Sequence, residues 1–439
     1  MTITTPIHLS RLRIESIRGL RDVEIRFGAP EPERGQWTVL LGENGTGKST
    51  ILRALALVLA GPELGGVLFH SSRDVAPYLR DGSKLGRISL WTADPLLGPR
   101  LEVRSKGWEE SIAYEPFPIG APGPLLFGYG CRRGAALGVR ESSFTDLDSV
   151  ATLFDENAGL IAVETWLKGR LLAKLQSKRR EDREFFDALI ETLRRLLPGV
   201  EKVDIRREGV WLRGPAVGRS RLAAKSDGYV TTLAWVLDLI ARWAERASAR
   251  GEALDGGFNE QMTGLVLIDE IDLHLHPKWQ VRVVSELRQI FPRLSFVATT
   301  HNPLTLLGAR EGEVQVLARS METAEIEVRQ VDIPKGTRAD QVLTGEWFGL
   351  PSTLDAGTLD LLDQHRLLLQ KGVAADDPKR RDLEEKLRQR LHGFADTSVE
   401  RTALEVAAQL MTEDYRDLTP QDRKAIRSKI ARQLRREVK

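Results

Sequence analysis

The sequence has a single cysteine, Cys131, and no long uninterrupted apolar run. One cysteine excludes an intramolecular disulfide and fits a reducing compartment. No stretch reaches the roughly 18 consecutive apolar residues of a membrane-spanning helix, and the start of the chain lacks the basic and apolar pattern of a signal peptide. We therefore expect a cytoplasmic protein with no membrane partner.

The chain also lacks a dominant charge. Its 439 residues include 64 Lys and Arg against 62 Asp and Glu. The near balance gives no general attraction to nucleic acid or membrane, so any such binding must be local. The length allows two or three domains around a large buried core.

What the sequence does have is a complete phosphate-binding loop. The apolar run 38–41 is followed by Gly-Glu-Asn-Gly-Thr-Gly-Lys-Ser and then by a helix-forming run at 51–59. The glycines let backbone N–H groups point at phosphates, and the following helix adds the positive end of its dipole. Lys48 reaches the terminal phosphates and Ser49 can ligate Mg²⁺. The predicted nucleotide contacts are Gly42, Glu43, Asn44, Gly45, Thr46, Gly47, Lys48, Ser49 and Thr50.

A second motif lies where the branched run 265–268 leads into Asp269 and Glu270. Such a run is typical of a strand buried on both faces of a parallel sheet, whose carboxyl end delivers both carboxylates to the ligand edge. Asp269 would hold Mg²⁺, and Glu270 would act as general base on the attacking water. Taken alone the pattern is also an ordinary strand end, and the phosphate loop favours the functional interpretation.

A third strand is predicted at 294–300, with His301 directly after it. Its imidazole could hydrogen-bond the γ-phosphate, although a structural histidine at a strand end is the plainer interpretation. Convergence of three strand ends on one nucleotide favours the catalytic role.

A helix start is predicted at Ser226-Asp227-Gly228-Tyr229, because apolar residues follow it at helical spacing. Ser226 or Asp227 would cap an ordinary helix. The alternative is an anion site in which the Ser226 hydroxyl and the Gly228 N–H face a γ-phosphate bound by another subunit.

The order of these motifs resembles the ABC-type ATPase heads of the RecF, SMC and OLD group, over about residues 7–320. The resemblance implies an α/β P-loop head with a central, mostly parallel sheet, ATP and Mg²⁺ as cofactors, and two heads that sandwich two ATP molecules. Ser226, Asp227 and Gly228 would supply the signature motif in trans. His301 would be the switch histidine, and Asp272-Leu-His-Leu-His-Pro277 the loop that crosses the dimer interface.

Some features depart from that family pattern. No glutamine follows the predicted strand 124–129 where the family has one; Arg132 and Arg133 stand there instead, with either a phosphate or a structural carboxylate as partner. Lys225 replaces the leucine that often precedes the signature serine. His274 and His276 have the His-x-His spacing of a metal pair but no third ligand at a recognisable spacing. Arg18 is the predicted adenine contact.

Between the lobes, residues 162–197 have helical patterning interrupted by the charged run 178–184. This insertion, at about 150–200, is too short for a long coiled-coil arm. The mixed charges of the run favour a solvated helix face or a helix junction, and a DNA contact is the alternative. Short phrases around 153–167 and 299–304 resemble the smaller ATPases of prokaryotic antiphage systems, the Septu and retron-associated ATPases.

The C-terminal part is predicted to differ from the head. Two edge strands at 314–317 and 325–331 end a domain at residue 333, and residues 334–439 form an all-helical domain, with helix starts at Pro378 and Pro420. No Toprim pattern is found, so a nuclease would be a separate polypeptide. Trp347 and Phe348 fill either a core or an interface. The basic terminal helix, Arg423 to Lys439, faces either phosphates or an acidic partner.

These observations predict an ATP-hydrolysing head that forms a homodimer or higher oligomer and whose ATP cycle controls a separate effector, expected to be a nuclease, in antiphage defence. The alternative is a RecF-like DNA-repair clamp that binds nucleic acid directly. A transporter motor is a third class, and the atypical signature argues against it.

Overall fold

The computed structural model describes residues 6–391, apart from the gaps at 72–77, 94–97, 107–108, 116–124, 133–143, 178, 198, 216, 223–226, 346, 351 and 375. The strands are β1 (Leu9–Ile17), β2 (Leu20–Arg26), β3 (Trp37–Gly42), β4 (Leu85–Thr92), β5 (Arg100–Lys106), β6 (Glu109–Tyr114), β7 (Leu126–Tyr129), β8 (Lys202–Arg206), β9 (Gly209–Gly214), β10 (Gly218–Arg221), β11 (Gly264–Ile268), β12 (Leu294–Thr300), β13 (Val314–Arg319) and β14 (Ile326–Val331). The helices are α1 (Lys48–Ser71), η1 (Ala151–Leu153), α2 (Val163–Gln176), α3 (Arg180–Leu196), α4 (Asp227–Ala249), α5 (Phe258–Gln261), α6 (Pro277–Gln280), α7 (Val283–Ile290), α8 (Pro303–Leu306), α9 (Ala339–Thr344), α10 (Ala356–Gln370) and α11 (Pro378–Leu391).

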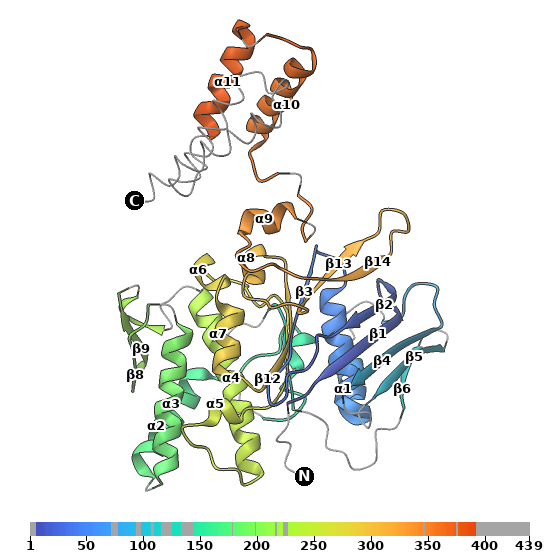
Figure 1. Cartoon of the computed structure of the whole chain (residues 1–439). Helices are drawn as coiled ribbons and strands as arrows, with labels where there is room; N and C mark the ends of the chain where they lie inside the picture. The colour runs from blue at the N-terminus through green and yellow to red at the C-terminus, as the bar shows by residue number, and fades with distance from the viewer. Residues whose placement is uncertain are drawn as a thin grey trace. The chain divides into compact units, whose positions relative to one another are not determined.

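A six-stranded sheet in the order β14-β13-β3-β12-β11-β7 forms the centre of the head (Figure 1). β3, β7, β11, β12 and β13 are parallel, and only β14 is antiparallel. The predicted α/β head with a mostly parallel sheet is therefore confirmed. One detail was wrong: β13 is not an edge strand, because it lies between β14 and β3.

The two faces of this sheet explain the continuous apolar runs in its strands. In β11, Leu265 and Leu267 join the core that contains α1, whereas Val266 and Ile268 join the core that contains α3 and α4. Because successive side chains of a strand point to opposite faces, a strand covered on both faces needs apolar residues at every position.

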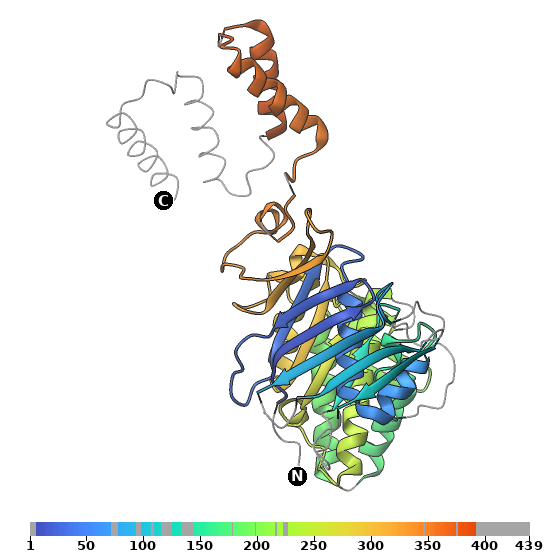
Figure 2. The same ribbon diagram turned by 90° about the vertical axis from the view of Figure 1, so that its right-hand side faces the viewer.

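A second, antiparallel sheet of order β2-β1-β4-β5-β6 covers the other side of α1, and Figure 2 shows this sheet in front. α1 is the one helix in the described part of the chain that is long and apolar enough to cross a membrane by length and composition. Ile51, Leu52, Leu55 and Val58 in its first half are fully buried among residues of the two sheets, and this packing accounts for the apolar composition there. Val67, near its end, is 49% exposed.

The predicted helical insertion is present as α2, which ends at Gln176, and α3, which begins at Arg180 within the charged run. Their apolar faces pack on α4, and a small antiparallel sheet of order β10-β9-β8 follows α3. The charged run therefore lies at a helix junction, as predicted.

The chain divides into one compact unit up to Leu350 and a second from Pro351. α9 belongs to the first unit because Val342 is fully buried beneath Trp347 and Phe348, so these aromatics fill a core. The domain boundary expected after residue 333 stays a prediction. In the second unit α11 starts at Pro378 as expected, with Asp377 Oδ1 accepting the Lys379 N–H at 2.8 Å. Pro420 and the basic terminal helix lie outside the described residues.

Candidate nucleotide-binding site

The phosphate loop joins the buried strand β3 to the first turn of α1. Gly45 and Gly47 have φ angles of 82° and 92°, in the left-handed region that favours glycine. A Cβ on Gly47 would lie 2.7 Å from Leu20 Cδ2, and one on Gly42 would lie 2.6 Å from the Leu317 carbonyl oxygen. The loop therefore needs glycine both for its curvature and for its close approach to β2 and β13.

Lys48 is folded over this loop and is buried. Its Nζ donates to the carbonyl oxygens of Gly42 at 2.6 Å and Glu43 at 2.9 Å. Burial lowers the pKa of its ammonium below the ordinary 10.5, and the nearby Asp269, Glu270 and Glu43 oppose that shift. The lysine is thus held at the mouth of the loop with carboxylates close by.

Asp269 connects three elements of the site. It directly follows β11 and is only 6% exposed. It accepts the Ser49 hydroxyl at 2.6 Å through Oδ2 and the Thr299 hydroxyl at 2.6 Å through Oδ1. Carboxylate and hydroxyl oxygens are the ligands that Mg²⁺ prefers, with phosphate and water completing its shell. The donor set of Ser49 and Asp269 therefore fits Mg²⁺.

Glu270 and His301 follow adjacent strands and face each other. His301 Nδ1 lies 3.8 Å from Glu270 Oε1, and their side chains are 54% and 27% exposed. Glu270 has a φ of 49°, an uncommon value for a residue other than glycine, and its N–H donates to Thr299 Oγ1 at 2.8 Å. The strained backbone turns the chain just after Asp269, so that the second carboxylate of the pair leaves the strand at the solvent-accessible edge.

The loop after Glu270 is held from within the head. Asp272 is buried and accepts the Thr300 hydroxyl at 2.7 Å. His276 caps α6 by accepting the Lys278 N–H at 3.3 Å, and His274 has a φ of 63°. The His-x-His pair therefore contains one helix-capping residue.

Some predicted site residues have no described position. Ser226 and Arg133 lie outside the described residues, and the side chain of Asp227 does as well. α4 begins at Asp227 and includes Gly228, so the predicted helix start is in place. Arg132 pairs with Glu156 at 2.6 Å, which is the structural-carboxylate alternative of the two considered.

Arg18, the predicted adenine contact, lies beside the N-terminal sheet. Its guanidinium carbon is 4.8 Å from the centre of the Tyr78 ring, and burial lowers its pKa. It lies near Thr50 and Arg53 of α1, around a gap too narrow to admit a water molecule. The adenine contact stays a prediction.

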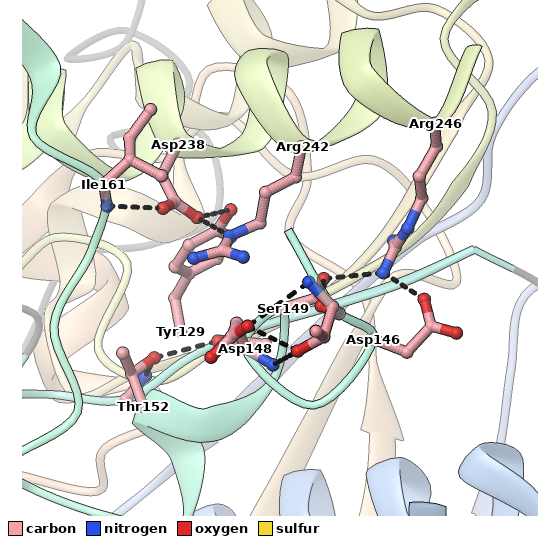
Figure 3. A network of polar contacts seen from close by, with 12 residues as sticks. Tyr129, Asp146, Asp148, Ser149, Thr152, Ile161, Asp238, Arg242 and Arg246 are labelled. Atoms are coloured by element: carbon pink, nitrogen blue, oxygen red, sulfur yellow. Dashed lines mark hydrogen bonds and ion pairs between the residues drawn. The ribbon is translucent and has the colours of Figure 1, made fainter. Parts of the chain in front are cut away.

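Sequence reasoning missed Thr299, whose hydroxyl bridges Asp269 and the Glu270 N–H. It also missed a buried polar network behind the site (Figure 3). Asp238 and Arg242 of α4 are 1% and 2% exposed and form an ion pair at 2.7 Å. The sequence did contain a signal for this ion pair, because two residues of opposite charge stand four positions apart on an otherwise apolar helix face.

This network reaches the site through β7. Tyr129 donates its phenol proton to Asp238 Oδ2 at 3.1 Å, and its carbonyl oxygen accepts the Asp269 N–H at 2.8 Å. Asp238 Oδ1 also accepts the Ile161 N–H at 2.9 Å. Burial raises the pKa of Tyr129 well above its ordinary value, and the Asp238 charge adds to the shift. The helix that starts at the predicted signature motif is thereby tied to the strand bearing Asp269.

Comparison with known proteins gives a consistent result. Residues 140–307 match the family described as "AAA domain, putative AbiEii toxin, Type IV TA system", and residues 11–83 match a second family described as "AAA domain". The chain is 31% identical to Septu protein PtuA of Bacillus mycoides (strain KBAB4) over 368 residues, which cover 82% of this chain and 47% of that protein. It is 32% identical to the Retron Vc95 probable ATPase of Vibrio cholerae serotype O1 biovar El Tor over 163 residues, which cover 34% of this chain and 30% of that protein. The predicted resemblance to Septu and retron ATPases is confirmed.

The chain spans about half the length of the first of these relatives. Among solved structures, the SMC head bound to the C-terminal winged-helix domain of ScpA matches with a TM-score of 0.43 and 16% identity, over 74% of this chain and 98% of that one.

Proposed function

The chain is an ABC-type P-loop ATPase head whose sequence matches two AAA-domain families. From this starting point we propose that it binds and hydrolyses ATP. The supporting observation is the convergence of three strand ends at one edge of the central sheet. β3 leads to Lys48 and Ser49, β11 ends in Asp269 and Glu270, and β12 leads to His301. In open parallel sheets, ligands bind at this edge.

The reaction is attack of water on the γ-phosphorus with departure of ADP. Glu270 accepts the proton of the attacking water, and Lys48 stabilises the negative charge on the phosphate oxygens. His301, at 3.8 Å from Glu270, hydrogen-bonds the γ-phosphate and is in position to register its loss. Mg²⁺ held by Ser49 and Asp269 would neutralise charge on the β- and γ-phosphates. Thr299 fixes the orientation of Asp269.

Each site is completed by a second copy of the chain. Ser226, Asp227 and Gly228 precede or open α4, a helix N-terminus suited to an anion, and they serve the γ-phosphate of the partner head. ATP binding therefore closes a homodimer, and hydrolysis opens it. Higher oligomers would be built from such dimers.

The closed and open dimers control a separate effector, a nuclease, in antiphage defence. The similarity to Septu PtuA and to a retron ATPase supports this role. The chain works in the cytoplasm, consistent with its single exposed cysteine. A RecF-like clamp is the alternative, and it differs in needing no effector protein.

The variant Glu270→Gln tests the hydrolytic part of the proposal. We expect ATP affinity within a few-fold of wild type, a turnover reduced by about 10²- to 10⁴-fold because the general base is lost, and a larger dimer fraction with ATP. Phosphate release and sedimentation with Mg²⁺-ATP would measure these. Wild-type turnover in the variant would remove Glu270 as the base.

A further inference from the structure

The outer face of the small sheet β10-β9-β8 carries an excess of positive charge. Cross-strand register places Lys202, Arg213 and Arg219 in one row, and Asp204, Trp211 and Arg221 in the next. Because the side chains of directly paired residues lie on the same face, these six residues share one face with Arg206. The opposite face, which includes Val203, Val210 and Leu212, is buried in the core.

Few acids compensate these five cations. Asp204 is the acid within the strands, and it serves three cations: Lys202 at 3.1 Å, Arg206 at 3.7 Å and Arg213 at 4.0 Å. Glu164 of α2 approaches one end, where Glu164 Oε1 accepts the Val210 N–H at 3.4 Å. The face thus keeps several cations whose charge is not balanced.

The other antiparallel sheet of the head is different. On β1, β2, β4 and β5 the arginines have carboxylates at short range, as in Arg13 with Asp22 at 2.8 Å and Arg87 with Glu102 at 2.8 Å. That sheet also carries several arginines, but its arginines have carboxylate partners. Of the two antiparallel sheets that the structure describes, the one formed by β8, β9 and β10 is the sheet whose cations outnumber its carboxylates so strongly.

Two further features suit a ligand with planar rings as well as charge. The guanidinium carbons of Arg206 and Arg219 lie 5.4 and 5.6 Å from the centre of the Trp211 ring. The cation–π contacts with this ring orient both planar guanidinium groups, which are hydrogen-bond donors. Next to this face is a hollow of about 340 Å³. Its apolar lining includes Leu171, Phe186 and Ile190, and its charged lining is the acid Asp204 with the three cations Lys202, Arg206 and Arg213. Figure 1 shows β8 and β9 at the outer edge of the head, beside α3.

We propose that this surface, the outer face of β8–β10 together with the adjoining hollow, binds single-stranded nucleic acid. Alternate residues of a strand lie about 6.8 Å apart and neighbouring strands about 4.8 Å apart, which gives a two-dimensional array of donors for successive phosphates. Arginine binds phosphate through a planar fork, and an unstacked base has a π-face that enters an apolar hollow. None of the exposed large apolar side chains of the described chain lies on these strands, which disfavours insertion into a membrane.

The test uses the full chain and a fluorescein-labelled deoxythymidine strand of about 20 nucleotides, longer than a typical single-strand site. The same length of oligouridine, a matched duplex and phosphatidylserine vesicles serve as the other probes. Anisotropy is measured from about 50 to 200 mM KCl. We expect the single strands to bind more tightly than the duplex, with a clear salt slope.

The variant Arg213→Ala/Arg219→Ala should lower that slope by about 1.4, since each single-strand phosphate contact contributes roughly 0.7, and should weaken binding at least tenfold at low salt. Arg87→Ala/Arg104→Ala is the matched control and should bind like wild type. ATP turnover should be normal in both variants, so failure here is distinguishable from failure of the proposed ATPase.

Crosslinking of a bromouridine strand to the wild-type chain gives an answer even if the variant fails to fold. Adducts within residues 171–221 support the proposal. The proposal would be overturned if adducts formed only elsewhere, or if Arg213→Ala/Arg219→Ala bound like wild type. It would also be overturned if the chain preferred the duplex or the vesicles, or bound none of the probes.

Discussion

The Ser49 hydroxyl lies 2.6 Å from Asp269 Oδ2, although 220 residues separate the two along the chain. This hydrogen bond joins the first turn of α1 to the end of β11 and brings together the two oxygen donors proposed for Mg²⁺. Because Thr299 holds the other carboxylate oxygen, Asp269 has one orientation in which both of its oxygens are used.

The pair Thr299→Val and Thr300→Val tests that orientation. Both threonines are fully buried, but one donates to Asp269 and the other to Asp272. We expect Thr299→Val to weaken Mg²⁺-dependent ATP binding and to lower turnover about tenfold, because a buried acceptor that loses its donor costs on the order of 1–3 kcal/mol. Titration calorimetry with and without Mg²⁺ measures the first effect.

Thr300→Val is the matched control in that experiment, with the same side-chain change one residue away. It should keep Mg²⁺-dependent ATP binding in the monomer. Equal loss in both variants would mean that the strand, and not the Asp269 contact, is responsible.

Lys48→Ala should abolish the thermal stabilisation that ATP gives. A ligand at 100 times its dissociation constant stabilises the native state by about 2.7 kcal/mol, which a melting curve resolves. Without nucleotide, the variant should melt close to wild type, since burial of the ammonium is itself unfavourable and offsets its two hydrogen bonds. An unchanged ATP-dependent shift in melting temperature would exclude Lys48 from phosphate binding.

The lowered pKa of Lys48 also predicts a pH dependence of binding. The protonated amine binds phosphate, and the free site loses that proton at a pH below the ordinary 10.5. ATP affinity should therefore start to fall at a lower alkaline pH than an unperturbed lysine would give, and binding there should take up a proton. Calorimetry in two buffers of different ionisation enthalpy detects this proton uptake. If ATP binding took up no proton at alkaline pH, Lys48 would not be the group that binds phosphate in its protonated form.

The buried pair behind the site predicts a non-additive stability effect. Asp238→Leu should reduce the free energy of unfolding by about 3–5 kcal/mol, because it leaves the Arg242 charge without its carboxylate in the core. The double variant Asp238→Leu/Arg242→Leu should recover part of that loss, because it removes the unpaired charge. It still leaves the Tyr129 hydroxyl and the Ile161 N–H without their acceptor. Urea unfolding of wild type, Asp238→Leu, Arg242→Leu and the double variant completes the cycle and measures the coupling. Additive losses would show that the two charges act separately.

Mixing two inactive variants tests whether the partner completes the site. Lys48→Ala removes the phosphate lysine and Ser226→Arg blocks the signature, so each homodimer has two defective sites. In a random equimolar mixture half of the two-fold dimers are mixed, and each of those has one intact site, so we expect about a quarter of wild-type turnover. A mixture as inactive as its components would argue against sites shared between subunits.

Much of the local backbone geometry of the candidate site was predictable because its motifs are local. A glycine-rich loop needs particular backbone angles at Gly45 and Gly47, and a doubly covered strand needs continuous apolar residues before Asp269. Capping residues predicted the helix start near Asp227, and the charged run predicted the junction between α2 and α3. Such constraints act within a few residues of chain and therefore leave a pattern in the sequence.

Other features arose only from pairing of distant segments. β13 reads as an edge strand from composition, yet it lies inside the sheet because β14 covers it. The Thr299 bridge, the tie from Asp238 through Tyr129 to Asp269, and the cationic face of β8–β10 all depend on register between strands. Cross-strand neighbours are set by tertiary packing, because sequence spacing alone does not fix which residues oppose each other.

The sequence by itself determined that the chain carries a phosphate loop and two carboxylates at strand ends, because glycine conformation and apolar patterning are local requirements. The tertiary structure alone decided that Ser49 reaches Asp269, that a buried ion pair stands behind them, and that five cations share one sheet face. Those relationships depend on long-range packing and register, which bring together residues far apart in the chain.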